Sequence, residues 1–142
     1  MKTIRILILE DDLKTLAVIM DEIFRLEESL VGKRLDFAVT VFSEYNQVQD
    51  YLNQVQEPNF DIILLDRDCK LGGSFQVINI KKFGAEKFIA ISTQPEYNET
   101  AIKMGVKRIV RKDYKQLNEF GSNLSDEIRK MIDENTNKKE FE

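Results

Sequence analysis

The segment FDIILLDRD, residues 60–68, has four consecutive isoleucine and leucine residues, Ile62 to Leu65, followed directly by Asp66. A short run that is apolar at every position, rather than at alternate ones, is typical of a strand covered on both faces in a parallel sheet. Comparable runs occur elsewhere in the chain. The sequence therefore predicts five strands, over Thr3–Leu9, Leu35–Phe42, Phe60–Leu65, Lys87–Ser92 and Lys107–Arg111.

Segments with helical spacing separate these strands. In the first of them, apolar residues recur at three- and four-residue steps, namely Leu13, Leu16, Ala17, Met20, Ile23 and Phe24. Further helices are expected over Val48–Val55, over Ser74–Phe83 with an end at Gly84, from Pro95 to Gly105, and around Leu124, Ile128, Met131 and Ile132. Regular alternation of strands and helices predicts one α/β domain with a doubly wound parallel sheet.

Composition excludes several classes of function. The chain has 142 residues, no histidine, one cysteine and a net charge of −4. Without histidine it cannot carry a Ser-His-Asp or Cys-His catalytic site, a histidine-ligated zinc or a phosphohistidine of its own. The lone Cys69 cannot form an internal disulfide, and no apolar stretch is long enough for a membrane span. We therefore expect a cytoplasmic protein that binds neither nucleic acid directly nor a membrane.

Polar side chains gather where the predicted strands end. Glu10, Asp11 and Asp12 follow the first strand, Asp66, Arg67 and Asp68 the third, Ser92 and Thr93 the fourth, and Lys112 the fifth. The carboxyl ends of parallel strands form one edge of the sheet, where ligands of open α/β folds bind. The acidic cluster, the hydroxyl and the lysine should therefore lie close together.

Carboxylates in one crevice repel each other unless a proton or a cation offsets their charge. Magnesium prefers oxygen ligands and uses few carboxylates, so the sequence predicts a Mg²⁺ site formed by Glu10, Asp11, Asp66 and the backbone carbonyl of Asp68. With charge offset in this way, one carboxylate could attack a phosphoryl group and form an acyl phosphate. A lysine and a hydroxyl nearby would then bind the phosphate oxygens.

Four segments together resemble the receiver domain of two-component response regulators, including those of the chemotaxis-regulator type. They are ILILEDD (6–12), DIILLD (61–66), FIAIST (88–93) and GVKRIVRK (105–112). The resemblance implies a flavodoxin-like sheet with strand order 2-1-3-4-5, covering residues 1–134 and followed by a polar tail over 135–142. It also implies that Asp66 is the phosphorylation site and that Ser92 and Lys112 assist catalysis.

The resemblance implies partners as well. A sensor histidine kinase or a phosphotransfer protein would donate the phosphoryl group, with bound Mg²⁺. Ser92 would then move toward the phosphate and repack the face of the fourth helix, fifth strand and fifth helix, which would bind a downstream protein. Homodimerisation through this face is left open.

Some residues depart from the receiver pattern and keep two alternatives open. Asp113 stands where proline is common, Ile109 where an aromatic residue is common, and Thr93 where a small residue is common. These departures would also suit a pseudo-receiver, a binding module that is never phosphorylated. The third reading is a Mg²⁺-dependent phosphohydrolase of the haloacid-dehalogenase type, because Asp66-Arg67-Asp68 resembles its DxD motif; the order of the motifs along the chain favours the receiver.

Overall fold

The computed structural model describes residues 1–54, 60–66, 80–94, 99 and 101–140. In this part of the chain, five strands form one parallel sheet in the order β2-β1-β3-β4-β5. The strands are β1 (Lys2–Leu9), β2 (Leu35–Phe42), β3 (Ile62–Asp66), β4 (Phe88–Ser92) and β5 (Arg108–Arg111). The predicted doubly wound sheet and its 2-1-3-4-5 order are confirmed.

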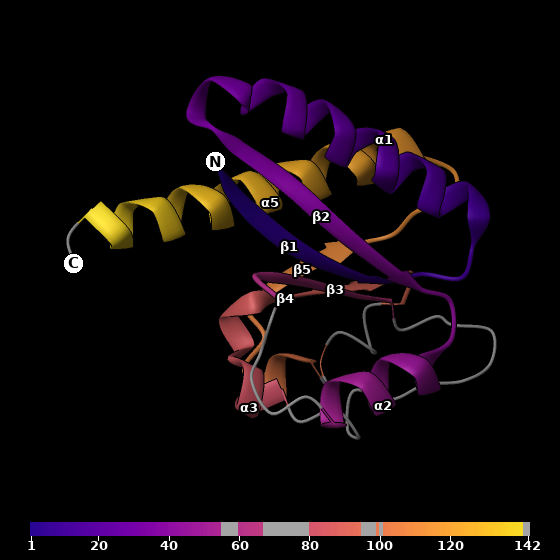
Figure 1. The fold of residues 1–142 in the computed structure, drawn as a ribbon. Coiled ribbons are helices and arrows are strands. Elements are labelled where there is room, and N and C mark those ends of the chain that lie inside the picture. The colour runs from indigo at the N-terminus through magenta and orange to yellow at the C-terminus, as the bar shows by residue number, and fades with distance from the viewer. Residues whose placement is uncertain (55–59, 67–79, 95–98, 100, 141–142) are drawn as a thin grey trace.

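Helices cover both faces of the sheet (Figure 1). They are α1 (Leu13–Ser29), α2 (Tyr45–Gln54), α3 (Ile80–Phe83) and α5 (Leu117–Glu140), with short 3₁₀ turns at Val31–Lys33 and Ala85–Lys87. Helices α1 and α5 lie on one face, and α2 and α3 on the other. None of the described helices combines the length and the apolar character that crossing a membrane requires.

Each face of the sheet has its own apolar core. Ile6 and Ile8 of β1 pack with α1 and α5, whereas Leu7 and Leu9 of the same strand pack with α2 and α3. Successive side chains of a strand point to opposite faces, so a strand buried on both sides needs apolar residues at every position. This requirement explains the continuous apolar runs in β1, β3 and β4.

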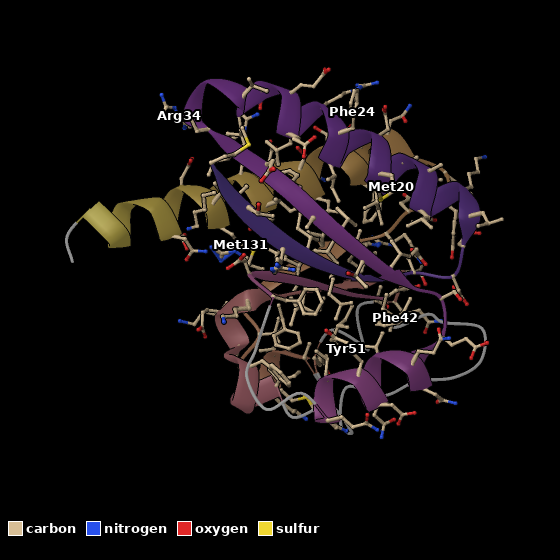
Figure 2. The ribbon with its side chains drawn as sticks, viewed as in Figure 1. Met20, Phe24, Arg34, Phe42, Tyr51 and Met131 are labelled. Atoms are coloured by element: carbon tan, nitrogen blue, oxygen red, sulfur yellow. The ribbon has the colours of Figure 1, made fainter. Side chains whose placement is uncertain are left out.

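Helix α2 is held partly by aromatic contacts. The ring of Tyr51 lies 5.8 Å from that of Phe42 at the end of β2 (Figure 2) and 5.8 Å from that of Phe60, which precedes β3. Val48 and Leu52 of the same helix are buried against the sheet. The predicted second helix is therefore confirmed over Tyr45–Gln54, while Val55 lies outside the described residues.

The apolar stripe predicted for the first helix is wrong in part. Thr15, Ile19, Ile23 and Leu26 are the buried residues of α1. Leu13 is 79% exposed and Phe24 is 55% exposed, and Met20 also reaches the surface (Figure 2). The helix has apolar residues on two adjacent faces, and only the face toward the sheet enters the core.

The remaining helices differ from expectation mainly at their ends. Helix α3 stops before Gly84, whose φ of +93° lies in the left-handed region that suits glycine at a helix end. Residues 74–79 lie outside the described part of the chain, as do 95–98 and 100; residues 101–103 are helical. Residues 135–140, expected to be a polar frayed tail, continue α5 as a helix instead.

Candidate functional site

Four of the predicted site residues are buried together at the carboxyl edge of the sheet. Glu10 follows β1, Asp66 and Ser92 end β3 and β4, and Lys112 follows β5. Leu9 and Leu65 are partners in the pairing of β1 with β3, so the next residues, Glu10 and Asp66, leave the sheet side by side. The convergence expected from the strand order is therefore present for these four side chains.

Lys112 binds both buried carboxylates. Its Nζ lies 3.1 Å from Glu10 Oε1 and 3.1 Å from Asp66 Oδ2, and the three side chains are at most 1% exposed. The backbone N–H of Lys112 donates to the carbonyl oxygen of Ser92 at 2.9 Å, which fixes the lysine beside the end of β4. Charge-assisted hydrogen bonds of this kind hold the three side chains in one geometry.

Burial changes the ionisation of the groups in this cluster. Burial, and next the neighbouring Asp66, raise the pKa of Glu10 to about 8, although the Lys112 ammonium opposes this change. Burial alone would lower the pKa of Lys112, but the carboxylates of Asp66 and Glu10 outweigh it and raise that pKa above its ordinary value. Glu10 therefore holds a proton at neutral pH, in a place from which water is excluded, and a bound cation would favour its ionised form.

Asp11 adds a third carboxylate to the cluster. One carboxylate oxygen from each of Glu10, Asp11 and Asp66 can be chosen so that the three lie within 4.8 Å of one another. Glu10 Oε2 also accepts the backbone N–H of Asp11 at 3.0 Å, which orients the Glu10 carboxylate. Three oxygen donors at this spacing fit a hard divalent cation such as Mg²⁺. The fourth predicted ligand, Asp68, lies outside the described residues.

Asp12 has a different part in the structure. Its Oδ2 accepts the backbone N–H of Thr15 at 3.0 Å and the Thr15 hydroxyl at 2.6 Å. Asp12 is therefore the N-cap of α1, as its position before the helix predicts. This cap fixes the start of α1 next to the acidic cluster.

The hydroxyl of Ser92 is buried at the end of β4. Ser92 Oγ accepts the backbone N–H of Gln94 at 3.0 Å and lies 3.2 Å from the carbonyl oxygen of Gln94, to which it donates. Thr93, next to it, is half-buried. The local hydrogen bonds hold the Ser92 hydroxyl at the same edge of the sheet as Asp66 and Lys112.

Of the residues that depart from the receiver pattern, Ile109 packs against the core on the α2 side and is half-buried. Asp113 is exposed, and its Oδ1 accepts the backbone N–H of Lys115 at 2.9 Å. Both residues thus have local packing or turn-forming roles beside Lys112.

Tyr114 is a site residue that sequence reasoning missed. Lys112 Nζ lies over its ring, 5.2 Å from the ring centroid, and Tyr114 is 52% exposed. Burial raises the pKa of its hydroxyl, with the Lys112 charge opposing, so the phenol is neutral at physiological pH. The signal in the sequence that could have identified Tyr114 is its position, two residues after the candidate lysine.

Comparisons with known proteins agree on the fold. The chain is similar to a response regulator receiver domain from Rhodospirillum rubrum, with a TM-score of 0.64 and 16% identity over 86% of this chain and 91% of that one. It is also similar to the HemR receiver domain from Leptospira biflexa in its non-phosphorylated form, with a TM-score of 0.55 and 22% identity over 88% and 94% of the two chains. An orphan response regulator of H. pylori gives a TM-score of 0.53 and 18% identity over 87% and 95%.

No protein-family model and no curated protein matches the sequence. The structural likeness is nevertheless consistent across these chains. The fold is that of response regulator receiver domains.

Proposed function

We propose that this chain is a phosphoacceptor response regulator, which takes a phosphoryl group from a partner's phosphohistidine onto Asp66 and signals by a change of conformation. The observation that carries the proposal is the buried cluster in which Lys112 binds both Glu10 and Asp66 at the carboxyl edge of a receiver-type sheet. Ser92 and the oxygen donors of Asp11 adjoin this cluster.

The proposed transfer uses each of these groups. A carboxylate oxygen of Asp66 attacks phosphorus, the P–N bond to the donor imidazole breaks, and the imidazole takes up a proton as it leaves. Lys112 and Ser92 then donate hydrogen bonds to oxygens of the new acyl phosphate. Mg²⁺, bound by Glu10, Asp11 and Asp66 with Asp68, would supply positive charge to the carboxylates and the phosphoryl group.

The partners follow from the same proposal. The chain has no histidine, so a sensor kinase or phosphotransfer protein must supply the phosphohistidine. A downstream protein would bind the face that contains β5 and α5, in the cytoplasm, as the resemblance implies. Residues 1–134 would form the receiver domain, and the helical residues 135–140 would extend from it.

Incubation with acetyl phosphate or phosphoramidate and Mg²⁺, followed by intact mass measurement, tests the proposal. We expect one added phosphoryl group, which is absent in Asp66→Asn because the attacking carboxylate oxygen is lost. Asp61→Asn is the matched control: Asp61 precedes the same strand, and its Oδ2 accepts the backbone N–H of Arg5 at 2.9 Å, far along the sheet from the cluster. This control should still gain the group.

A phosphorylation-independent binding module is the second candidate. Ile109 and Asp113 favour it: Ile109 is half-buried where the receiver pattern commonly has an aromatic residue, and Asp113 is exposed where that pattern commonly has proline. The same measurement separates the two functions. An unmodified mass for the wild-type chain would contradict phosphoacceptance and support the binding module.

Magnesium should stabilise the folded protein through the acidic cluster. A ligand that binds only the folded state at ten times its Kd raises the free energy of unfolding by about 1.4 kcal/mol. Asp11→Asn should lose most of this gain, because Asp11 contributes one of the three clustered oxygens. Urea unfolding across a Mg²⁺ titration measures the effect.

The control for this titration is Asp50→Asn, which removes an exposed carboxylate on α2. It should respond to Mg²⁺ as the wild-type chain does. Equal responses from Asp11→Asn and wild type, or no response from wild type, would count against the metal site.

A further inference from the structure

The ring of Tyr114 lies over the ammonium of Lys112, the positively charged group of the cluster that an incoming anion would bind. The Lys112 ammonium has three N–H donors, and Glu10 and Asp66 each lie 3.1 Å from its nitrogen. The ring of Tyr114 faces the same nitrogen at 5.2 Å from the centroid, a distance at which the negative face of an aromatic ring attracts a cation. Lys112 itself is 1% exposed, whereas Tyr114 is 52% exposed. One side of the ring thus contacts the ammonium, while much of the residue is in solvent.

Glu10 Oε1, Glu10 Oε2 and Asp66 Oδ2 already lie within 3.5 Å of Lys112 Nζ. A phosphoryl oxygen must therefore approach this nitrogen from a direction that the two carboxylates leave open. We propose that Tyr114 is a positioning residue: its ring covers this direction of Lys112 in the resting site and moves aside when a phosphoryl oxygen binds. This inference rests on the proposed function. It implies that Tyr114 slows the gain of the phosphoryl group, because this step requires the ring to leave. The rate of loss should not depend on the ring, because the ring has already moved aside in the phosphorylated protein.

The Tyr114 ring faces Lys112, and a hydrogen bond from Lys112 to the Tyr114 hydroxyl is among the interactions that lower the pKa of this phenol. The phenol is neutral at physiological pH, so the attraction to Lys112 comes from the aromatic face and not from a second negative charge. Tyr114→Phe keeps this face, and Tyr114→Leu removes it while keeping an apolar side chain. The pair therefore separates the effect of the ring from a general effect of side-chain volume.

Rates of phosphoryl gain from acetyl phosphate with Mg²⁺, and of loss after donor removal, can be measured by intact mass for each variant. Tyr114→Leu should raise the rate of gain about three- to thirtyfold, the range expected from the strength of a cation–π contact, and should leave the rate of loss close to wild type. Tyr114→Phe should retain slow rates close to wild type. Lys115→Ala, an exposed neighbour, is the control for changes in the loop and should leave both rates unaltered.

The possible results are distinct. A wild-type rate of gain in Tyr114→Leu would overturn this inference and leave phosphoacceptance intact. A faster gain in Tyr114→Leu than in both wild type and Tyr114→Phe would support the covering role. No adduct on any variant would overturn both proposals.

A double-mutant cycle tests the contact without phosphorylation. Tyr114→Leu should raise the unfolding equilibrium constant several-fold in the wild-type background, because a cation–π contact is lost. In the Lys112→Met background the same change should have little effect. Equal effects in the two backgrounds would contradict the contact.

Discussion

Replacing Lys112 by methionine is expected to lower the free energy of unfolding by about 3–5 kcal/mol at neutral pH without divalent cations. Methionine keeps the length of the side chain but leaves Glu10 and Asp66 buried side by side without their shared ammonium. Urea unfolding in the presence of a chelator measures the loss. Lys115→Met, at an exposed position in the same loop, is the matched control and should change the stability by less than about 0.5 kcal/mol.

The stability of Lys112→Met should rise as the pH falls below 8. The pKa of Glu10 is already raised to about 8 in the presence of Lys112, against 4.5 for an ordinary glutamate. Removing the ammonium takes away an interaction that lowers this pKa, so the folded variant holds its proton to higher pH still. The folded state then binds more protons than the unfolded chain above pH 4.5, and stability falls as the pH rises through this range.

Lys112→Met should therefore gain stability between pH 8 and pH 5. The gain should exceed that of wild type only slightly, because Glu10 of wild type already holds its proton over most of this range. If Lys112→Met were as stable as Lys115→Met at neutral pH, the charge of Lys112 would not stabilise the buried cluster. A loss of stability on acidification would contradict the assignment of the raised pKa to Glu10.

The site could be predicted largely because strand ends are easy to find in sequence. Once the apolar runs are placed, the topology alone brings the next residues of neighbouring strands to one edge, and Glu10 and Asp66 are such neighbours. The contacts within the cluster could not be predicted in the same way. Whether Lys112 binds Glu10, Asp66 or both depends on side-chain directions, which periodicity does not determine.

The contact of Tyr114 with Lys112 could not be predicted from sequence either. Tyr114 lies two residues beyond the strand-end lysine, where the chain is no longer part of the sheet and a side chain can point in many directions. Only the three-dimensional packing places its ring against Lys112. The sequence shows that an aromatic residue follows a candidate site residue. It does not indicate which group the aromatic ring contacts.

The helices differ in how well their faces could be predicted. In α1, Leu13 and Phe24 fit the helical period as well as the buried residues do, and only the position of the sheet decides which face enters the core. In α5, the predicted Leu124 and Ile128 are buried, but Leu117 and Phe120 extend the buried face toward the start of the helix, by about two turns. The buried residues before Gly121 are hard to predict from sequence, because glycine is unfavourable inside a helix and interrupts the helical pattern.

Gly121→Leu is expected to lower the free energy of unfolding by about 3 kcal/mol, the upper part of the range for overpacked interiors. Gly121 lies where α5 packs against α1: a Cβ atom added there would stand 2.7 Å from Val18 Cγ1 and 3.1 Å from Glu22 Cγ. Leucine has the better helix propensity by close to 1 kcal/mol, so propensity alone predicts a gain of stability. The sign of the measured change therefore decides between local propensity and packing of the two helices.

Gly32→Leu is the matched control, because nothing lies within 4 Å of a Cβ atom added at Gly32. It should change the stability by less than about 0.5 kcal/mol in the same urea unfolding experiment. Adding Val18→Ala to Gly121→Leu removes the atom in closest approach, Val18 Cγ1, and should restore part of the loss beyond the sum of the single changes. If Gly121→Leu were as stable as Gly32→Leu, α1 and α5 could separate at little cost, and the close approach of the two helices at Gly121 would not be what fixes α1 beside the acidic cluster.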